Sequence, residues 1–519
     1  MKSNCAAALA ALFLCLAPAT LEAQDVTLTS RDGQIELAGT MLGFDGEFYR
    51  VETIYGELTI DSSGVTCEGP GCPNLQDFVA ELSISGSATM GAVLMPALVE
   101  GFAQRNGYEA VRRDEDDTHF TYTLIDSRSG KPAGHFFFRV SNSDEGFADL
   151  LANEADLVMS LREITEDEKD RAIEAGMGDM EQARRSNVLA LDAIVPIVSP
   201  QNPVRAISPL QVARVYAGQV RNWRELGGAD APITLHAPAP DSGLGQAAVD
   251  RILEPAGLEI SPNAVRHRRG DVLAHSVSRD PFALGVSSFA EIGDAQALIL
   301  EGTCGRSLRA TRRTIKTEDY PLAAPMFLYT PVRRLPQVAR AFLAFTQSPE
   351  AQLVIRRSGF VDQAPEEIPI DEQGNRFVNA ISAAGDGIDL TELQRMTERL
   401  GPMKRLTTSF RFEAGSVLLD AQSRANVVQL AQRLEQGRYD ARELLFVGFS
   451  DGDGFAESNR AIAQRRAEAV RQSVLQAAEA ADLSKTQIGV EAFGEAMPMA
   501  CDDSSWGRLT NRRVEVWVR

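Results

Sequence analysis

The stretch Leu82-Ser-Ile-Ser-Gly-Ser-Ala-Thr89 decides the fold class of this 519-residue chain. It is a short apolar strand that runs into a Gly-Ser-Ala-Thr turn, and a helical pattern with apolar residues at 90, 94, 97, 98 and 102 follows it. A strand followed directly by an amphipathic helix is typical of α/β domains. Because this alternation continues to about residue 363, it favours two lobes over a single one.

Length and composition exclude several classes of function. With 44% apolar and 24% charged residues, the chain is expected to fold into about two to four domains. Its 52 Lys and Arg face 72 Asp and Glu, a formal charge of -20, which disfavours nucleic-acid binding because phosphate backbones attract positive surfaces. The five His and six Cys show neither CxxC nor HExxH spacing, so the sequence predicts no metal and no cofactor.

Residues 1–23 have the order of a secretory signal peptide: a Lys, an apolar run over 5–17 and then small residues. The run is shorter than the roughly 20 residues that span a bilayer, and no later stretch is long and uncharged enough to do so. We therefore predict an exported chain without a membrane span, cleaved after Ala23. A lipoprotein anchor on Cys15 is disfavoured because the bulky Leu14 precedes it.

Removal of the signal peptide leaves four cysteines, an even number in an oxidising compartment. Cys67 and Cys72 flank a Glu-Gly-Pro-Gly turn, and we predict a local disulfide between them. Cys304 and Cys501 fall in different predicted domains. Two alternatives stay open for this second pair: a disulfide that staples the domains together, or two buried free thiols.

These patterns predict an α/β multidomain chain. Residues 24–77 alternate apolar and polar residues between turns, as in Phe48-Tyr-Arg-Val-Glu-Thr-Ile-Tyr55, which is typical of a small β module. Residues 78–365 carry the two-lobed α/β pattern. Residues 366–403 are polar and punctuated by glycine around one helical piece, which indicates a linker, and residues 404–519 return to a compact α/β pattern.

Three turns within residues 78–365 place Ser, Thr or Gly at the start of a helix that follows a strand. Helix N-termini carry unsatisfied N–H groups and partial positive charge, so hydroxyl groups there can hold an oxyanion, with an Arg to complete the shell. An ordinary N-cap is the structural alternative at each turn. The candidates are Ser87 and Thr89 in the first turn, Asp156, Ser160 and Arg162 around the second, and Ser242 and Gly243 in the third.

Further motifs accompany these turns, above all Val215-Tyr-Ala-Gly-Gln-Val-Arg-Asn-Trp-Arg-Glu-Leu-Gly-Gly228. With them, residues 78–365 resemble the periplasmic phosphate-binding (PstS-like) solute-receptor family. The resemblance implies a periplasmic binding protein fold, in which two lobes joined by a hinge close on a small oxyanion such as phosphate, and it adds an ABC permease as a partner. Carried over position by position, it implies that the seven candidates of the three turns bind the ligand.

Two departures from that family affect the predicted anion site. Relatives have Ser-Gly-Thr where this chain has Ser242-Gly-Leu244, and the Arg usual a few residues upstream is absent from His236-Ala-Pro-Ala-Pro240. Each lost charge-assisted hydrogen bond costs about 1.5–3 kcal/mol, so we expect weak phosphate binding unless other groups replace them. The run His267-Arg-Arg269 is a candidate replacement, although a basic run beside a glycine is more typical of a solvated loop.

The C-terminal segment brings an acid and a base to one predicted strand–helix junction. A buried strand ends at Asp451-Gly-Asp-Gly454, and the helix over 459–477 carries Arg466 on the same row as Ile462 and Val470. A guanidinium on an inward face needs a partner, and Asp451 is a natural one. The residues alone favour a structural ion pair. A calcium loop is disfavoured because the further acidic ligands of that motif are absent.

Motifs spread over residues 404–519 include Gly448-Phe-Ser-Asp-Gly-Asp-Gly454, Gln464-Arg-Arg-Ala-Glu-Ala-Val470 and Gly507-Arg-Leu-Thr-Asn-Arg-Arg513. With these motifs the segment resembles the OmpA C-terminal-like peptidoglycan-binding domain. The resemblance implies that Asp451 and Arg466 hold the diaminopimelate residue of the wall peptide, which offers an ammonium and a carboxylate, with Asn459 and Arg512 as further contacts. The usual His-Thr before the Asp is Phe-Ser here, which changes the pocket wall without removing either charge.

Together these features predict a periplasmic protein that binds a small oxyanion in a two-lobed receptor and is held non-covalently to peptidoglycan. We expect a binding protein and not an enzyme. The alternative is a structural protein of the cell envelope whose receptor domain has lost its ligand and mediates protein contacts. A hydrolase that uses Ser87, Ser160 or Ser242 is disfavoured because no His or Lys base motif lies near them in the sequence.

Overall fold

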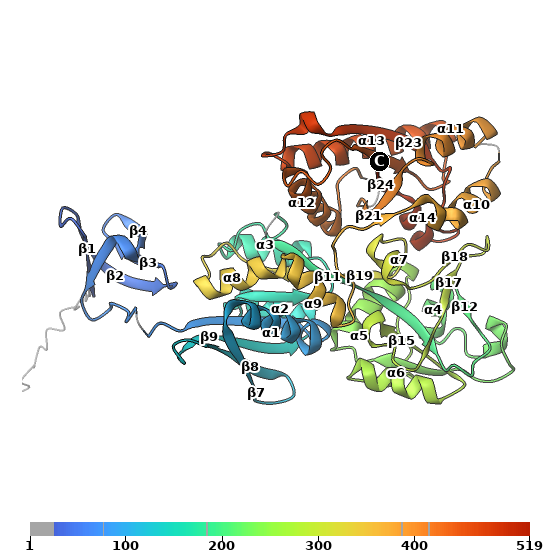
Figure 1. Cartoon of the computed structure of the whole chain (residues 1–519). Coiled ribbons are helices and arrows are strands. Elements are labelled where there is room, and N and C mark those ends of the chain that lie inside the picture. Colours follow the sequence, from blue (N-terminus) through green and yellow to red (C-terminus); the bar gives the residue numbers. More distant parts are fainter. Residues whose placement is uncertain (1–24, 76, 183–184, 386–387, 414–415) are drawn as a thin grey trace, which may run out of the picture. The chain divides into compact units, whose positions relative to one another are not determined.

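The computed structural model describes residues 25–75, 77–182, 185–385, 388–413 and 416–519. These form two compact units that divide at Ala80 (Figure 1). The predicted signal peptide, residues 1–23, lies outside the described residues. None of the helices in the described ranges is long and apolar enough to cross a lipid bilayer.

The first unit is an antiparallel sheet in the order β4-β3-β2-β1-β5. Its strands are β1 (Val26–Ser30), β2 (Glu36–Phe44), β3 (Phe48–Thr53), β4 (Gly56–Asp61) and β5 (Val65–Glu68). Alternate residues of β1 and β3 point inward, and Val26, Leu28, Tyr49 and Val51 form a small core. A disulfide joins Cys67 to Cys72 and confirms the predicted local bridge.

The second unit begins with a two-lobed domain built on a mixed sheet in the order β14-β13-β15-β11-β19-β10-β6-β9-β8-β7, with β16 paired to β11. The strands are β6 (Ala80–Ser87), β7 (Tyr108–Asp114), β8 (His119–Asp126), β9 (Pro132–Ser141), β10 (Leu157–Ser160), β11 (Ser186–Val198), β13 (Thr234–Pro238), β14 (Val265–His267), β15 (Ala283–Ser288), β16 (Gln296–Ala297) and β19 (Ala323–Tyr329). A small sheet contains β12 (Ala206–Ile207), β17 (Ile299–Glu301) and β18 (Ser307–Leu308).

The strand β11 joins the two lobes. Its residues 186–193 pair with β19 of the first lobe, and its residues 194–198 pair with β15 of the second. Nearly all of β11 is buried, in keeping with an apolar run that is covered on both faces. Within this domain, Figure 1 shows α1, α2, β8 and β9 on one side of β11 and β19 and α4, α6 and β15 on the other.

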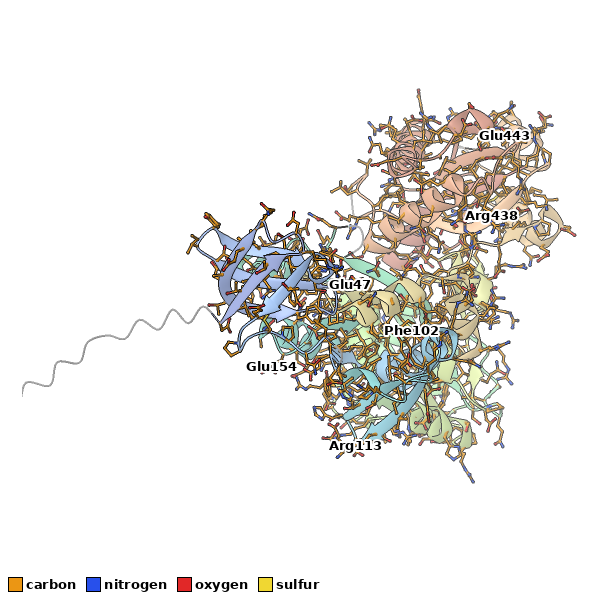
Figure 2. The ribbon with its side chains drawn as sticks, turned by 60° about the vertical axis from the view of Figure 1, so that its left-hand side comes forward. Glu47, Phe102, Arg113, Glu154, Arg438 and Glu443 are labelled. Carbon is orange, nitrogen blue, oxygen red and sulfur yellow. A yellow bond between two sulfur atoms is a disulfide. The ribbon has the colours of Figure 1, made fainter. Side chains whose placement is uncertain are left out.

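Helices cover both lobes of this sheet. The first lobe contains α1 (Met95–Asn106), α2 (Ser143–Leu151), α3 (Glu166–Glu174), α8 (Gln337–Thr346) and α9 (Pro349–Arg357), and the second contains α4 (Pro209–Tyr216), α5 (Gly243–Ala248), α6 (Gly270–Arg279) and α7 (Arg312–Lys316). Phe102 of α1 is buried in the common core, whereas Arg113 and Glu154 lie at the surface (Figure 2). Trp223 of the Asn-Trp motif is buried, and its Nε1 donates to the carbonyl of Phe282 at 2.8 Å.

The C-terminal domain is a second α/β layer, with strand order β20-β21-β24-β22-β23. Its elements are β20 (Glu367–Ile368), β21 (Lys404–Phe410), α12 (Ala421–Glu435), β22 (Glu443–Phe449), α13 (Ala456–Ala477), β23 (Gln487–Gly494), α14 (Ser505–Asn511) and β24 (Arg513–Val518). The helix α13 packs closely on β22, because a Cβ atom on Gly448 would lie 2.1 Å from the carbonyl oxygen of Ala463. This close packing brings the end of β22 next to α13.

The segment 366–403, for which the sequence indicated a linker, carries β20, α10 (Gly374–Ser382) and α11 (Leu390–Leu400). Leu393, Met396 and Leu400 of α11 pack with Val447 and Trp517 of the C-terminal sheet. The apolar residues of α11 recur at three- and four-residue spacing, so a polar overall composition hides a helix with one buried face. The segment is thus part of the C-terminal layer.

Within the second unit, the C-terminal domain packs directly against the two-lobed domain. Arg405 of β21 donates two hydrogen bonds to Asp319, at 2.7 and 3.0 Å, and both side chains are buried. Trp506 of α14 joins the core of the two-lobed domain, and its Nε1 donates to the carbonyl of Arg251 at 2.8 Å. A bidentate buried ion pair fixes orientation as well as distance.

A covalent bond reinforces this contact. Cys304 and Cys501, which are 197 positions apart, form a disulfide. The sequence left two alternatives open for this pair, and the structure shows the disulfide between the domains and not two free thiols.

Candidate functional sites

The first candidate turn ends β6 where the two lobes meet. Gly86 has φ +124°, and a Cβ atom there would lie 2.2 Å from the carbonyl oxygen of Met159, so only glycine fits beside β10. The next residue, Ser87, is fully buried, and its hydroxyl has no hydrogen-bond partner among the described residues. Gly243 of the second lobe faces it, since a Cβ atom on Gly243 would lie 2.8 Å from Ser87 Oγ. The structure therefore brings Ser87 and Gly243 together across the lobes.

The N-terminus of α2 also faces the turn that carries Ser242 and Gly243. Asn142 Nδ2 donates to the carbonyl of Asp241 at 3.1 Å, and the backbone N–H of Ser143 donates to Gln246 Oε1 at 3.2 Å. The sequence candidates omitted the two side chains that make these bonds, Asn142 and Gln246. Asn142 could have been found from the sequence as a helix N-cap, because it precedes Ser-Asp-Glu. In the structure it caps α2 by accepting from the N–H of Glu145.

Ser160 and Arg162 are engaged within their own lobe. Ser160 Oγ donates to the carbonyl of Arg162 at 2.7 Å. The guanidinium of Arg162 bonds to Glu168 at 2.7 and 2.8 Å and also to Asp144. Two carboxylates therefore compensate the charge of this Arg, which leaves little of it for a ligand.

Asp156 lies away from Ser87. It precedes β10, at the opposite end of this strand from Ser160, and its carboxylate accepts from the N–H of Ser83 at 2.7 Å and pairs with Arg333. Because Ser83 and Ser87 are four residues apart on one strand, Asp156 is about 13 Å from the Ser87 level. The structure does not bring Asp156 together with the first turn.

Ser242 has the role of an ordinary cap. Its Oγ accepts from the N–H of Gly245 at 3.0 Å and donates to the carbonyl of Ala239 at 2.7 Å, so it caps α5. Thr89 lies half-buried in the helical turn after β6. Ser242 is thus bonded within its own turn, and the side chain of Thr89 makes no capping bond to the helical turn that follows it. Neither hydroxyl makes a bond toward Ser87 among the described residues.

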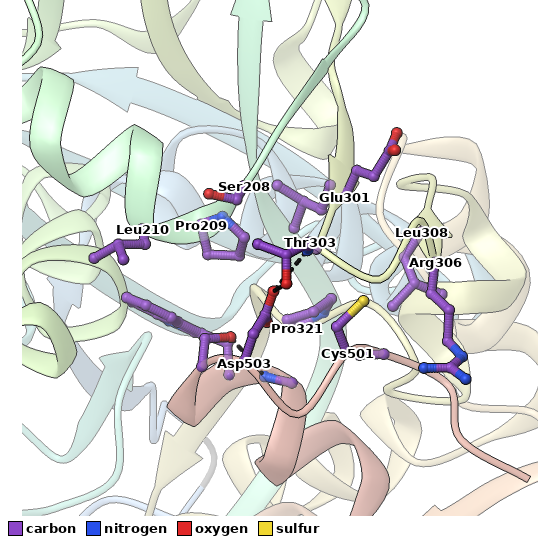
Figure 3. A pocket seen from close by; sticks show the side chains of 16 residues that line it. Ser208, Pro209, Leu210, Glu301, Thr303, Arg306, Leu308, Pro321, Cys501 and Asp503 are labelled. Atoms are coloured by element: carbon purple, nitrogen blue, oxygen red, sulfur yellow. Dashed lines mark hydrogen bonds between the residues drawn. The ribbon is translucent and has the colours of Figure 1, made fainter. Parts of the chain in front are cut away.

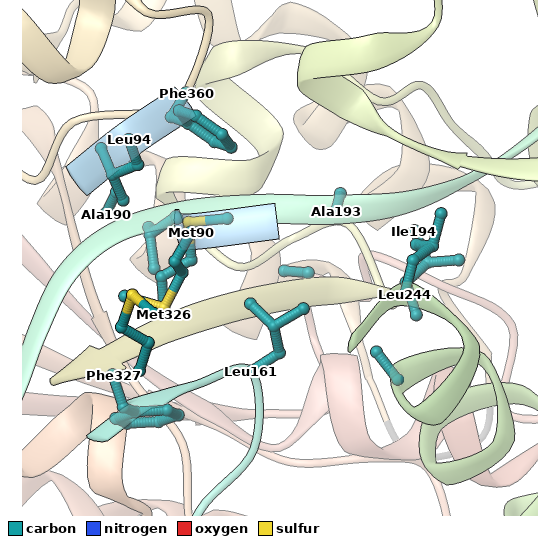
Figure 4. Packing of buried hydrophobic residues seen from close by; sticks show 14 of the residues in the cluster. Met90, Leu94, Leu161, Ala190, Ala193, Ile194, Leu244, Met326, Phe327 and Phe360 are labelled. Atoms are coloured by element: carbon teal, nitrogen blue, oxygen red, sulfur yellow. The ribbon is translucent and has the colours of Figure 1, made fainter. Parts of the chain in front are cut away.

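Apolar side chains pack beside Ser87 and Gly243. Leu161 and Leu244 are both more than nine-tenths buried and belong to the common core of the two lobes (Figure 4). The Cδ1 atom of Leu161 lies 3.4 Å from the position that a Cβ on Gly243 would take. The site is consequently a single buried hydroxyl without a partner among the described residues, with Gly243 and apolar side chains beside it.

The basic run near His267 is turned to other partners. His267 stacks on His236, with 2.8 Å between Nε2 and Nδ1, and Arg269 is exposed and pairs with Asp271. Arg268 is exposed as well. The structure thus favours the solvated-loop interpretation of this run.

The second candidate site lies at the junction of β22 and α13. Asp451 and Arg466 are both more than nine-tenths buried. The sequence paired these two, but the ion pair in the structure joins Asp451 Oδ2 to Arg512 Nη1 at 2.8 Å. Arg466 Nη2 donates to the carbonyl of Ser416 at 3.3 Å, and its guanidinium lies 5.1 Å from the ring centre of Phe412.

Arg466 has no carboxylate partner at this junction among the described residues, since Asp451 bonds to Arg512. Burial lowers the pKa of Arg466, the neighbouring charge of Arg512 lowers it further, and Asp451 acts in the opposite direction. Asp451 thus lies near two guanidinium groups and bonds to only one of them. Arg466 Nε and Ser450 Oγ are buried without a partner in the part of the chain that the structure describes. The site can accept a carboxylate at Arg466 and an ammonium at Asp451.

Asn459 belongs to the acidic rim of the same junction. Its Nδ2 donates to Glu495 Oε2 at 3.2 Å, and the N–H of Gly452 donates to Asp502 Oδ2 at 2.9 Å. The sequence candidates did not include Glu495 or Asp502. Both come from loops that are distant in the sequence, so neither the spacing nor the periodicity placed them here.

Residues 75–350, more than half of the chain, match the family model of the PBP superfamily domain. The chain belongs to the PBP superfamily. Residues 411–512 match the model of the OmpA family. We refer below to the PBP domain and the OmpA-family domain.

Individual proteins show similarity to the two domains. SphX of Synechococcus elongatus is 25% identical over 234 residues, which cover 43% of this chain and 67% of that relative. The solved ABC-type phosphate transport receptor of Vibrio cholerae is 20% identical, with a TM-score of 0.41, over 54% of this chain and 99% of that one. The peptidoglycan-associated lipoprotein of Burkholderia pseudomallei is 27% identical, with a TM-score of 0.19, over 21% of this chain and 89% of that one.

The family matches confirm both resemblances and the α/β multidomain fold class that the sequence predicted. Among the curated relatives is the phosphate-binding protein PstS of Staphylococcus haemolyticus, which is 22% identical over 210 residues. The identity of the ligand and the site residues stay predictions.

Proposed function

We propose that this protein is a periplasmic receptor whose PBP domain binds a small oxyanion between its lobes, and whose OmpA-family domain holds it non-covalently to peptidoglycan. An ABC permease that takes up the released anion is the further partner. The proposal for the PBP domain is carried by one observation, the unpartnered hydroxyl of Ser87 that faces Gly243 of the other lobe.

A buried hydroxyl without a partner costs about 1–3 kcal/mol, which an acceptor oxygen of a ligand would recover. The backbone N–H groups that begin the helices around Ser87 favour a negative charge on that ligand. Since Arg162 is compensated by Glu168 and Asp144, the anion gains no free guanidinium there. The site therefore suits a compact oxyanion such as phosphate, bound with moderate affinity.

Calorimetric titration of the full chain with phosphate, sulfate and small carboxylates tests this half of the proposal. We expect heat with a compact oxyanion, and a loss of about tenfold or more in affinity in Ser87→Ala. Ser276→Ala, a change at a half-buried position of α6 whose hydroxyl bonds only to the carbonyl of Val272, is the matched control and should bind as the parent does. No heat with any anion would instead favour the structural envelope protein whose receptor domain has lost its ligand.

The proposal for the OmpA-family domain rests on Arg466, which lies close to the Asp451–Arg512 ion pair and has no carboxylate partner of its own among the described residues. Diaminopimelate in a wall peptide presents a carboxylate and an ammonium on one carbon atom. Its carboxylate would bond to the free edge of Arg466, and its ammonium would share Asp451 with Arg512. Burial of both side chains strengthens these interactions relative to water.

Sedimentation with purified peptidoglycan tests this second half. Asp451→Ala and Arg466→Ala should each leave the protein in the supernatant, because each removes one of the two charges that the ligand needs. Arg465→Ala is the matched control, since Arg465 is the adjacent Arg of α13 and is exposed. Unchanged pelleting of both charge variants would remove the wall-binding proposal.

A further inference from the structure

Three consecutive residues, Cys501, Asp502 and Asp503, lie between the PBP domain and the wall-binding junction. Two of them bond to one loop of the PBP domain. Cys501 forms the disulfide with Cys304, and Asp503 Oδ2 accepts hydrogen bonds at 2.6 Å from both the N–H and the hydroxyl of Thr303 (Figure 3). A covalent bond and two short hydrogen bonds therefore fix residues 501–503, called the strap below, to this loop of the PBP domain.

The middle residue, Asp502, bonds to the wall-binding junction and not to the loop of the PBP domain. Asp502 Oδ2 accepts from the N–H of Gly452 at 2.9 Å, and Asp502 Oδ1 accepts from Asn511 Nδ2 at 2.8 Å. Gly452 directly follows Asp451, and Asn511 directly precedes Arg512. Each oxygen of Asp502 thus holds the neighbour of one member of the Asp451–Arg512 ion pair.

The strap has little freedom to move on its own. Asn511 is fully buried and its Oδ1 accepts from the N–H groups of Met499 and Ala500, at 2.7 and 3.0 Å. A Cβ atom on Gly507 would lie 1.8 Å from the carbonyl oxygen of Cys501, and one on Gly302 would lie 2.6 Å from its Cβ. Because such packed contacts do not deform continuously, a shift of the PBP loop shifts the strap with it.

We propose that Asp502 is a positioning residue for the wall-binding site and that the Cys304–Cys501 disulfide fixes it to the PBP domain, so that docking of the two domains sets the affinity for peptidoglycan. The inference rests on the proposed wall-binding function. Its physical basis is preorganisation: without the strap, the turn at Asp451 and the residue Arg512 must be ordered at the moment of binding, and that cost reduces affinity.

The test measures the affinity of the full-length protein for purified peptidoglycan, with near-ultraviolet circular dichroism to monitor the fold. Asp502→Ala removes both acceptors and should weaken binding about fivefold or more, the lower end of usual coupling between sites. Asp502→Asn keeps one acceptor and should lie between Asp502→Ala and the parent. A merely structural role for Asp502 would lower the melting temperature without this graded loss of affinity.

The double variant Cys304→Ser/Cys501→Ser should weaken binding to a similar extent. The matched control is Cys67→Ser/Cys72→Ser, which removes the other disulfide and should bind as the parent does. If the double variant does not fold, Asp503→Ala replaces it in the test. This variant removes only the bonds to Thr303, so we expect a smaller loss of affinity for peptidoglycan.

Unchanged affinity in Asp502→Ala and in the folded strap variants, while the parent binds, would overturn the inference and leave the proposed function intact. Failure of the parent itself to bind peptidoglycan would remove the wall-binding proposal and this inference with it.

Discussion

Glu318 is half-buried in the PBP domain, its Oε1 atom is buried, and Arg411 of the OmpA-family domain donates to its backbone carbonyl at 2.8 Å. Burial, with a smaller contribution from the charge of Asp420, raises the pKa of Glu318 to about 8. An acid whose pKa is higher in the folded state stabilises the fold fully below its unfolded pKa, and this contribution is lost as the pH rises through the folded pKa. Stability should therefore fall between about pH 4.5 and pH 8 on account of this group.

The measurement is the melting temperature of the full chain and of Glu318→Gln at pH 5 and at pH 8. Because Gln does not ionise, the variant should lose less stability between the two pH values than the parent. An equal loss in both proteins would show that Glu318 does not titrate between the two pH values.

Single residues also show how far sequence reasoning extends. Ser87, Asp451 and Arg466 could be predicted because each sits at a fixed place in a strand–turn–helix motif. The engagement of Arg162 could not, since Asp144 and Glu168 reach it from two separate helices. Tertiary contacts decide which charged side chains have no partner of opposite charge, and the spacing of residues in the sequence does not predict those contacts.

Among the secondary-structure elements, the contact between β22 and α13 positions the wall-binding residues. In Gly448→Ala the new methyl carbon would lie 2.1 Å from the carbonyl oxygen of Ala463, so the helix must move away from the strand. We expect a loss of about 1–3 kcal/mol in the free energy of unfolding, measured by urea denaturation.

Gly374→Ala is the control for this prediction. Gly374 begins α10 with φ −51°, and a Cβ there meets nothing within 4 Å, so the substitution should be neutral or stabilise by up to about 1 kcal/mol. Similar unfolding free energies for the two variants would contradict the close packing of α13 on β22.

Elements were easier to predict than their assembly. The alternation of strands and helices that starts at β6 was visible in the sequence because burial on both faces leaves continuous apolar runs, as in β11. The packing of α11 was not, because a helix with a narrow apolar face and many charges resembles a linker in composition.

For the molecule as a whole, the buried pair Arg405–Asp319 joins the two domains of the second unit. Asp319→Ala leaves a buried guanidinium without its main partner and should cost about 3–5 kcal/mol. Calorimetry of the full chain should then show the OmpA-family domain melting separately from the PBP domain, where the parent gives one common transition for both.

Asp271→Ala is the matched control, because it removes an exposed ion pair with Arg269 and should cost less than about 1 kcal/mol. A parent whose two domains already melt independently would contradict the role assigned to Arg405–Asp319.

The relation between the two domains was the feature that the sequence could least predict. Nothing in the spacing of Cys304 and Cys501 distinguishes a disulfide from two thiols, and Arg405 and Asp319 are 86 positions apart. Such pairs can be recognised only in the folded structure, where residues distant in the sequence come into contact.

Asp451, Arg466 and Arg512 are proposed to recognise one amino acid of the wall through its carboxylate and ammonium. A calorimetric titration of the full chain tests this with two soluble wall peptides that differ at one residue, diaminopimelate in one and lysine in the other. The lysine peptide lacks the carboxylate that Arg466 would bind. We expect the diaminopimelate peptide to bind and the lysine peptide to bind at least about tenfold more weakly; equal affinity for both peptides, or no binding of either, would show that these three residues do not recognise diaminopimelate.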